Sequence, residues 1–230
     1  MKRIGLVACV HGNEKYGIKV LKKIDRISYK GKIIPIIANS EAAKKNKRYI
    51  DMDLNRCFPG KQRGNCEQRL AYSLTKILKK CDYVIDLHSS SIKTDPFIIT
   101  TRLSRRHKEL ISYIPIKKVV LITKKLAKGN ALIDNCSCGI SIEIGQHNDT
   151  RNGSRAINII KNMLENLEKR KAAQKTFFSA YAIVRHGEKH PKKLRNFVAY
   201  YENKSRVYPI LITPKRNAPD GIHYLKARKI

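Results

Sequence analysis

The sequence predicts an α/β protein with a mixed, largely parallel central sheet flanked by helices, followed by a small β-rich domain at the C-terminal end. Two observations support this fold class. Up to residue 172, short apolar runs alternate with segments of helical periodicity, which is typical of strands joined by helical crossovers. Beyond that residue the segments become short, strand-like and separated by turns.

The predicted strands of the first part are short apolar runs rich in β-branched residues, as expected for a sheet that is buried on both faces. They cover residues 4–10, 32–39, 83–87, 96–101, 118–122 and 139–144. The predicted helices place apolar side chains three or four positions apart on one face. They cover residues 16–25, about 67–80 and 151–171.

A domain boundary is predicted near residue 172, which divides the chain into an α/β domain at 1–172 and a small β-rich domain at 173–230. The second domain is expected to contain strands at 177–184, 196–201 and 206–213. We expect this second domain to cover the functional site of the first.

Charge and apolar content limit the classes of partner. The chain has 49 Lys and Arg against 18 Asp and Glu, a formal net charge of +31, and such a field attracts polyanions. The lysines are dispersed, however, and no basic arm or RNA-binding motif with interleaved aromatics is present. Nucleic acid therefore stays an alternative partner rather than the favoured one. No apolar run reaches the roughly 18 residues that a membrane span needs, so we expect a soluble protein.

The cysteines and the N-terminal segment indicate a cytoplasmic location. The six cysteines form no CxxC pair, and a chain of this length needs no disulfides, so reduced thiols are expected. Cys136 and Cys138 are poor candidates for a shared metal, since alternate residues of an extended segment point to opposite faces. The apolar stretch 4–10 superficially resembles a signal peptide but continues directly into His11 without a cleavage site.

Metal-binding side chains follow two of the predicted strands. His11 and Glu14 lie in the tetrapeptide HGNE after the first strand, and His88 ends the run YVIDLH. In open α/β sheets, functional sites gather at the carboxyl ends of strands. Two histidines and a carboxylate match a catalytic zinc site with an open fourth position. Asp86 lies two residues before His88 on the same strand face, where it either accepts the other imidazole N–H or packs elsewhere.

Two further groups provide the chemistry that a metal hydrolase requires. Glu143 lies in the apolar run GISIEIG, where an ionised carboxylate is costly unless it faces a cation or a polar site. It is the candidate general base, although a structural ion pair with a lysine is the alternative. In the loop RYIDMDLNRCF, Arg48 and Arg56 can bind carboxylates in a bidentate manner and Asn55 adds an amide donor. A solvated loop paired internally through its two aspartates is the alternative here.

Four motifs in this order, HGNE, RYIDMDLNR, DLHSS and IEIG, resemble the succinylglutamate desuccinylase/aspartoacylase family of the zinc carboxypeptidase superfamily. They lie within residues 11–146. The resemblance implies a mixed sheet of the zinc carboxypeptidase type and one Zn²⁺ per chain. It also implies that His11, Glu14 and His88 hold this zinc, and that Glu143 is the general acid/base.

The resemblance further implies a small anionic N-acyl amino acid as substrate. Arg48 matches the arginine that polarises the scissile carbonyl, and Asn55 and Arg56 match residues that hold the substrate carboxylate. Tyr200, in the segment AYYE, matches a tyrosine of the family's C-terminal domain that reaches over the active site. The expected reaction is attack of an activated water on the amide carbonyl, with Glu143 passing the proton to the leaving amine.

The chain departs from the family in two ways: its second domain is short, which predicts a wider mouth of the pocket, and one arginine has no counterpart. Aspartoacylases carry an additional substrate-binding arginine shortly before the catalytic glutamate, and residues 132–141 contain no arginine. Arg102, Arg105 and Arg151 are the alternatives. A carboxypeptidase-like peptidase stays the second enzymatic hypothesis, because the metal ligands are shared across the superfamily.

Overall fold

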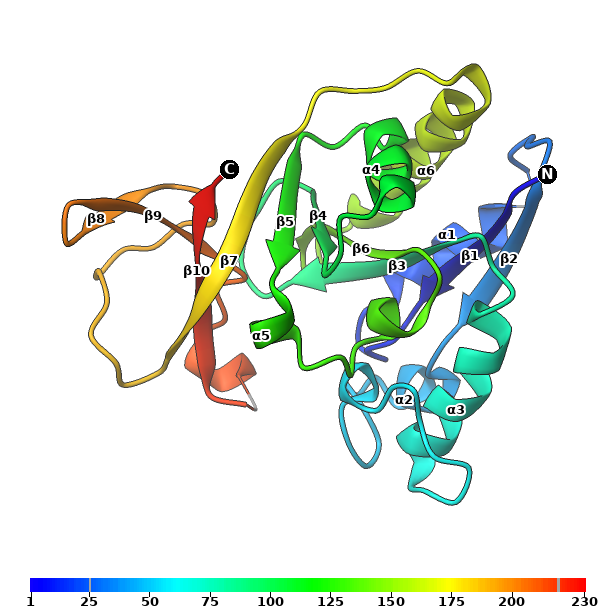
Figure 1. Ribbon diagram of the computed structural model, residues 1–230. Helices are drawn as coiled ribbons and strands as arrows, with labels where there is room; N and C mark the ends of the chain where they lie inside the picture. The colour runs from blue at the N-terminus through cyan, green and yellow to red at the C-terminus, as the bar shows by residue number, and fades with distance from the viewer. Residues whose placement is uncertain (25, 219) are drawn as a thin grey trace.

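One sheet of ten strands runs through the part of the chain that the computed structural model describes, residues 1–24, 26–218 and 220–230 (Figure 1). The strand order is β2-β1-β3-β6-β4-β5-β7-β10-β9-β8. In chain order the strands are β1 (Arg3–Ala8), β2 (Lys32–Ile37), β3 (Tyr83–Ser90), β4 (Phe97–Thr100), β5 (Lys118–Ile122), β6 (Gly139–Gln146), β7 (Thr176–Arg185), β8 (Tyr200–Glu202), β9 (Ser205–Ile210) and β10 (Ile222–Lys229).

The sheet is mixed and largely parallel in its first part, which confirms the predicted fold class. Strands β2, β1, β3 and β6 are parallel to one another. Strand β4 is antiparallel to β6 but parallel to β5. The carboxyl ends of β1, β3 and β6 therefore meet at one edge of the sheet, where the predicted ligands and Glu143 are expected to gather.

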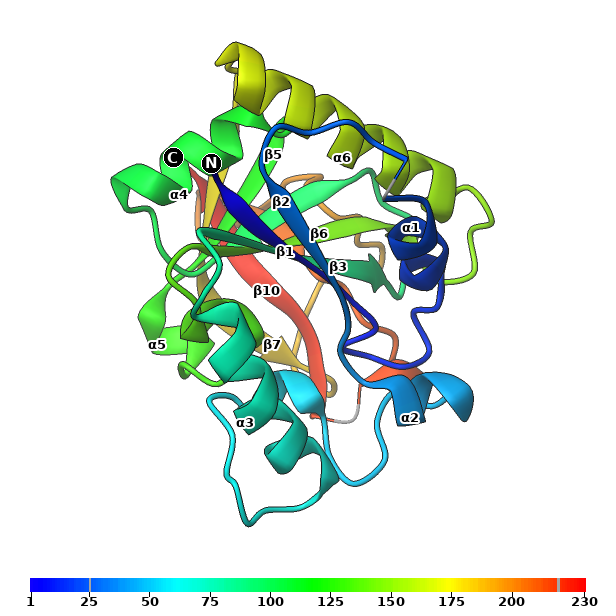
Figure 2. The same ribbon diagram turned by 90° about the vertical axis from the view of Figure 1, so that its right-hand side faces the viewer.

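Helices cover both faces of the parallel part of the sheet, as Figure 2 shows. The helices are α1 (Tyr16–Ile24), α2 (Ser40–Lys44), α3 (Cys66–Leu78), α4 (Arg105–Tyr113), α5 (Lys124–Ala127) and α6 (Asn152–Lys169). Apolar side chains of α1, α4 and α6 pack in one buried cluster, and those of α3 pack in another on the opposite face. None of the helices in the described residues is long and apolar enough to span a membrane.

Helix α3 has a complete N-terminal cap. The Asn65 side chain accepts a hydrogen bond from the Gln68 backbone N–H, and the Gln68 side chain accepts one from the Asn65 backbone N–H. This capping box satisfies two of the free N–H groups at the helix start. The helix therefore begins at Cys66, and its buried side chain at Glu67 has a fixed position from which to organise the preceding loop.

Most predicted elements are confirmed within a few residues, but the prediction was incomplete. Asp25, the predicted last residue of the first helix, lies outside the described residues. Helices α2, α4 and α5 and strand β10 were not predicted. The strand predicted at 196–201 is wrong over most of its length, because β8 begins only at Tyr200. The preceding residues form turns before it.

The sheet continues beyond the predicted domain boundary at residue 172. Strand β7 is parallel to β5, β10 is antiparallel to both β7 and β9, and β9 pairs with β8. These last strands form the end of the sheet on the left of Figure 1. Both parts of the chain therefore contribute strands to one sheet. The division into domains at 1–172 and 173–230 stays a prediction.

Cys136 and Cys138 point to different sides of the sheet, as expected from their spacing. Cys136 belongs to the apolar cluster of α3, and Cys138 belongs to the cluster of α1, α4 and α6. Burial raises the pKa of both thiols, that of Cys138 to about 11. They are therefore neutral core residues, as the spacing argument predicts.

Candidate metal centre and active site

The three predicted ligands meet at the carboxyl edge of the sheet. Strand β1 pairs with β3 through Ala8 and Leu87, so the loop after β1 lies beside the end of β3. One ligand atom from each of His11, Glu14 and His88 lies within 4.8 Å of the others, and all three residues are buried. Side chains from positions 11 and 88 thus form one donor set.

The loop that carries His11 and Glu14 is fixed by close packing. The Glu14 backbone N–H donates to the His11 carbonyl, 3.0 Å, and the Gly12 N–H donates to the Arg48 carbonyl, 3.1 Å. A Cβ on Gly12 would lie 2.2 Å from the carbonyl carbon of Ala42 in α2. Glycine is therefore required here because the loop and α2 touch backbone to backbone.

Each histidine is held by two carboxylates, one on each ring nitrogen. His11 Nδ1 lies 3.0 Å from Glu14 and its Nε2 lies 3.1 Å from Asp53. His88 Nδ1 lies 3.4 Å from Glu14 and its Nε2 lies 2.6 Å from Asp86. The two outer aspartates fix the ring orientation and tautomer, as carboxylates do behind zinc-bound histidines. Both Nδ1 atoms therefore face Glu14.

The charge state of Glu14 follows from these neighbours. Burial would raise the pKa of this carboxyl, but His11 and His88 hold it below its ordinary value. The Ser89 backbone N–H also donates to Glu14, 2.9 Å. Burial would lower the pKa of His88, whereas Asp86 and Glu14 raise it well above its ordinary value. The two imidazoles are thus surrounded by carboxylates before any ligand binds, which is an arrangement suited to a cation.

Glu143 lies directly beside the donor set. It is paired across the sheet with His88, because β6 is parallel to β3 at this register. The Ser90 hydroxyl donates to Glu143 Oε2, 2.8 Å. Burial and the nearby Glu14 raise the pKa of Glu143, against the opposing effect of His88. A buried carboxyl with a raised pKa is suited to accept and return a proton in a reaction.

The loop between β2 and α3 is organised by one buried carboxylate. Glu67 accepts hydrogen bonds from the backbone N–H groups of Ile50, Asp51 and Met52 and from the Asn39 side chain. Burial would raise its pKa, yet these donors lower it. Ionised Glu67 therefore holds the loop in one conformation. The acidic group that it forms with Asp51 and Cys66 is thus occupied by structural hydrogen bonds.

Arg48 is connected to the donor set through Asp53. Its Nε and Nη2 donate to Asp53 Oδ2 at 3.2 and 2.8 Å, while Asp53 Oδ1 faces His11. Burial would raise the pKa of Asp53, but His11 and Arg48 keep it well below its ordinary value. Arg48 is about one-third exposed, so its guanidinium lies between the buried group and the surface.

Asn55 and Arg56 make other contacts. Asn55 Oδ1 accepts from the Leu132 backbone N–H, 2.9 Å. The half-exposed Arg56 donates to the Asn55 carbonyl, 3.0 Å, and lies 3.8 Å from Asp220. Asn55 therefore anchors the segment before β6, and Arg56 faces the segment before β10. Their predicted role in binding a substrate carboxylate stays a prediction.

Tyr200 lies in the C-terminal region and is paired with a second tyrosine. Its hydroxyl is 2.8 Å from that of Tyr224 in β10. Burial and this hydrogen bond raise its pKa, so it is neutral. Tyr200 packs against a small cluster that includes Val184, Ile212 and Tyr224. Its predicted position over the substrate stays a prediction.

Two of the three arginines considered as substitutes already have partners. Arg151 forms a two-pronged ion pair with Asp149, and Arg102 donates to the Asp134 carbonyl. Arg105, the first residue of α4, is exposed. These contacts identify none of the three as the missing arginine.

Sequence reasoning missed several contacts at the site. The hydroxyl of partly buried Tyr16 donates to the His88 carbonyl, 2.7 Å. His147, just after β6, has its Nδ1 2.8 Å from the Ser89 hydroxyl. Burial lowers the pKa of His147; Glu14 opposes this change and Arg48 adds to it. Ser89 and His147 could have been noticed in the sequence because they follow His88 and Glu143, where the carboxyl ends of β3 and β6 meet.

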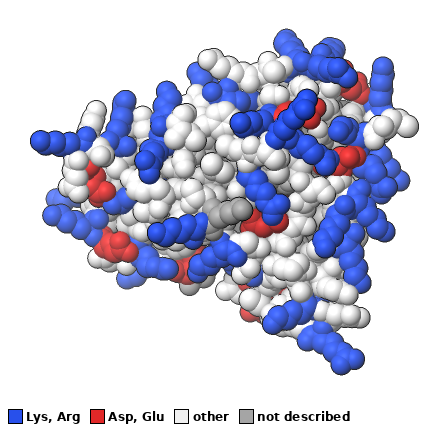
Figure 3. Space-filling view, viewed as in Figure 1, with Lys and Arg blue, Asp and Glu red and all other residues white. Residues whose placement is uncertain are grey.

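The surface charge is spread rather than concentrated. In Figure 3, Lys and Arg side chains lie around the whole outline of the visible face, with acidic side chains between them. This dispersed pattern agrees with the distribution of lysines in the sequence.

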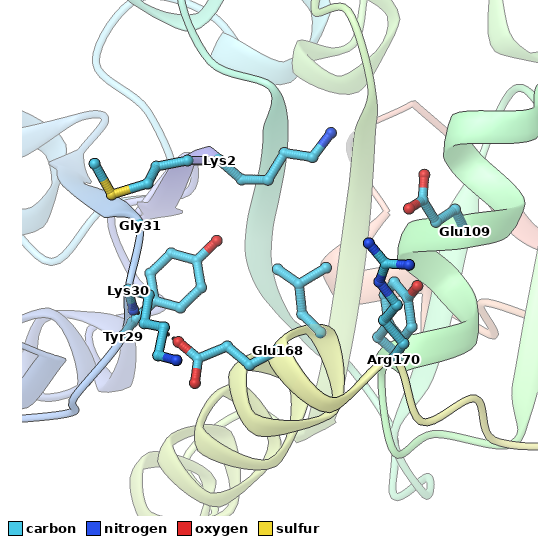
Figure 4. A pocket seen from close by; sticks show the side chains of 10 residues that line it. Lys2, Tyr29, Lys30, Gly31, Glu109, Glu168 and Arg170 are labelled. Carbon is cyan, nitrogen blue, oxygen red and sulfur yellow. Dashed lines mark hydrogen bonds between the residues drawn. The ribbon is translucent and has the colours of Figure 1, made fainter.

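A cavity of about 220 Å³ lies near the amino ends of β1 and β2 (Figure 4). The candidate metal ligands follow the opposite ends of the strands. Its lining mixes acids, bases and tyrosines, namely Lys2, Tyr29, Lys30, Glu109, Glu168 and Arg170 among others. Glu168 already accepts from the Lys30 backbone N–H, 2.7 Å. This cavity therefore contributes nothing to the chemistry of the donor set.

Comparison with known proteins agrees with this geometry. Residues 1–170 match the model of the succinylglutamate desuccinylase/aspartoacylase catalytic domain. A probable aspartoacylase of Prochlorococcus marinus (strain AS9601) is 30% identical over 167 residues, which cover 63% of this chain and 54% of that protein. One from Acaryochloris marina is 26% identical over 163 residues, covering 63% and 55%. The chain spans about half the length of these relatives.

Solved structures share the fold over the full chain. Murine aminoacylase 3 superposes with a TM-score of 0.82 at 19% identity, covering 100% of this chain and 95% of that one. A succinylglutamate desuccinylase from Chromobacterium violaceum gives 0.75 at 19% identity, covering 100% and 85%. The C-terminal strands are therefore included in the shared fold.

Proposed function

Since this chain belongs to the succinylglutamate desuccinylase/aspartoacylase family, we propose that it is a zinc-dependent hydrolase that deacylates a small N-acyl amino acid. The observation that carries the proposal is the pairing of Glu143 with His88 across β3 and β6, beside the convergent side chains of His11 and Glu14. A donor set and a proton carrier thus share one edge of the sheet.

The donor set fits one zinc ion per chain at this centre. Two imidazoles and one carboxylate are a known catalytic zinc set that leaves a position open. The Nδ1 atoms of His11 and His88 face the same carboxylate, and Asp53 and Asp86 hold the opposite nitrogens. When bound there, zinc supplies a Lewis acid that polarises the amide carbonyl and acidifies water.

Glu143 carries the proton. Its pKa is raised, and it accepts a hydrogen bond from the Ser90 hydroxyl. Among the described residues it forms no ion pair with a lysine or an arginine. Its carboxylate takes a proton as water attacks the carbonyl carbon and delivers the proton to the leaving nitrogen. The products are a carboxylate and a free amino acid.

Arg48 stabilises the negative charge that develops on the carbonyl oxygen. Asp53 orients its guanidinium through Nε and Nη2, which leaves Nη1 without a protein partner among the described residues. Charged donors that are already in position lower the energy of an oxyanion without a reorganisation cost. Arg48 is thus linked through Asp53 to the proposed metal ligand His11 and can still donate to the substrate.

The substrate is expected to be small and anionic. Asn55, Arg56 and Tyr200 are the proposed contacts for its carboxylate and its amino acid part. The net charge of +31 favours the approach of anions over cations. The free cysteines of the chain suit a reducing compartment, and we propose a cytoplasmic location.

An activity panel tests this function. Zinc-loaded protein is incubated with acetyl and succinyl derivatives of acidic and basic amino acids and, in parallel, with peptides of similar size. We expect release of a free amino acid from at least one acyl derivative and loss of that activity after chelation. Hydrolysis of peptides alone would replace the deacylase with a carboxypeptidase-like enzyme. No hydrolysis of either class would contradict the proposal.

A further inference from the structure

A second group of histidines lies in the C-terminal region, outside the centre described above. His186 and His190 follow β7, and His223 lies in β10. The ring centroids of His186 and His223 are 4.5 Å apart, and those of His190 and His223 are 4.4 Å apart. Three of the seven histidines of the chain thus lie in direct contact.

Each ring has at least one nitrogen without a protein partner in the described residues. His186 Nε2 is 2.8 Å from the Thr213 carbonyl, which leaves its Nδ1 free. His190 Nδ1 is 2.8 Å from the Pro191 carbonyl, which leaves its Nε2 free. The Nδ1 of His223 is buried and makes no hydrogen bond with any described residue. A buried polar atom in this state is costly unless a ligand satisfies it.

We propose that His186, His190 and His223 form a second metal site, for a divalent transition-metal ion such as Zn²⁺. Metal-bound histidines characteristically donate their other N–H to a backbone carbonyl, and His186 and His190 already hold that contact. Neutral imidazoles are ligands preferred by zinc, copper and nickel rather than by calcium or magnesium. The site therefore selects a borderline or soft cation.

Binding requires a rotation of side chains. The free nitrogens do not lie as close together as the donor atoms of His11, Glu14 and His88. Zinc–nitrogen bonds are about 2.0–2.1 Å long, so the rings must turn toward a common point. His190 is exposed and lies on the connection between β7 and β8, where its side chain has the space to do so.

The charged residues next to the group are of mixed sign. Arg185 and Lys189 lie next to the group in sequence and oppose a cation, while Glu188 adds a carboxylate. Arg185 donates to the Asp220 carbonyl, 2.8 Å.

Such a site would join two segments of the C-terminal region. His223 directly precedes Tyr224, whose hydroxyl is bonded to Tyr200, and His190 belongs to the connection that leads to Tyr200. A shared ion would therefore fix the β7–β8 connection against β10. This role is structural and does not depend on the reaction proposed for the other centre.

Metal stoichiometry tests the proposal. The full chain is dialysed to equilibrium against buffered free Zn²⁺, and bound zinc is counted by elemental analysis. Wild type is compared with His190→Ala and His186→Gln, and with Lys189→Ala as the neighbouring control. We expect both histidine variants to bind one zinc fewer per chain than wild type, and the lysine variant to bind the same number.

The criterion is the difference in bound zinc between wild type and each variant. It is therefore independent of whether zinc occupies His11, Glu14 and His88. Equal zinc content in wild type and both histidine variants would overturn the second site. A loss in Lys189→Ala equal to that in the histidine variants would also overturn it, because the loss would not then arise from imidazole ligands.

Discussion

The carboxyl edge of β1, β3 and β6 and the region of β7–β10 carry polar groups in two different ways. At the first, His11, Glu14 and His88 are buried and joined to carboxylates. In the second, Tyr200 and the histidines are partly or fully exposed and contact buried Tyr224, one another or backbone carbonyls. Buried charged networks are fixed before a ligand arrives, whereas neutral, exposed contacts adjust at little cost. We therefore expect changes at the first region to affect chemistry, and changes at the second to affect stability and substrate binding.

The largest effect is expected for Glu143→Gln, which keeps the shape of the side chain but removes its ability to carry a proton. General acid–base groups contribute roughly 10²–10⁴-fold in rate, so kcat should fall by about that factor while bound zinc is unchanged. Steady-state kinetics and metal analysis measure the two quantities. Glu165→Gln, on the exposed side of α6, is the control. A kcat within a few-fold of wild type would remove Glu143 from the reaction.

Asp86→Asn should weaken metal binding without removing a ligand. Asp86 is buried and holds His88 Nε2 at 2.6 Å, and carboxylates in this position affect metal affinity by about 10–100-fold. Competition with a chromogenic chelator gives the affinity. Asp82→Asn, at a partly exposed residue directly before β3, should leave the affinity unchanged. Equal affinity in both variants would show that Asp86 does not orient a metal ligand.

Ser90→Ala should move the acid limb of the pH–rate profile. The reaction needs ionised Glu143, so kcat/KM falls as pH drops through the pKa of this carboxyl. Burial raises that pKa and the Ser90 hydroxyl lowers it. Removing the hydroxyl therefore raises the pKa further and shifts the acid limb to higher pH. Ser91→Ala is the matched control. An acid limb that moves to lower pH, or does not move, would contradict the assignment.

The smallest effect is expected for Tyr224→Phe in the C-terminal region. This change removes the hydrogen bond between the two tyrosine hydroxyls, worth about 0.5–1.5 kcal/mol of unfolding free energy. Denaturant unfolding measures the loss, and Tyr201→Phe, on an exposed side chain, should show none. We expect kcat to be retained. A large loss of kcat would break the distinction between the two regions.

Much of the first region could be predicted because parallel strands bring their carboxyl ends to one edge. The periodicity located β1, β3 and β6, and the residues directly after or within them supplied His11, His88 and Glu143. Asp86 could be assigned because alternate residues of a strand share a face, and its contact with His88 is confirmed. Local pattern and general topology were sufficient for these groups.

The contacts that were missed are long-range. Asp53 lies 42 positions from His11, and the sequence pairs it equally well with any nearby arginine.

Strand β10 has lysines and an arginine among its apolar residues, and only its pairing with both β7 and β9 makes it a strand. Helix α4 has few apolar positions, since its sequence RRHKELISY is mostly polar. Tertiary packing determines these elements more than local preference does.

The central claim is that one divalent ion is held between the two histidines and Glu14, with Glu143 beside it. An anomalous difference map at the zinc edge, from a crystal of the zinc-loaded protein, tests this most directly. The account predicts a peak bonded to His11 Nδ1, His88 Nδ1 and the Glu14 carboxylate. Full zinc loading with no peak between these three side chains would contradict it.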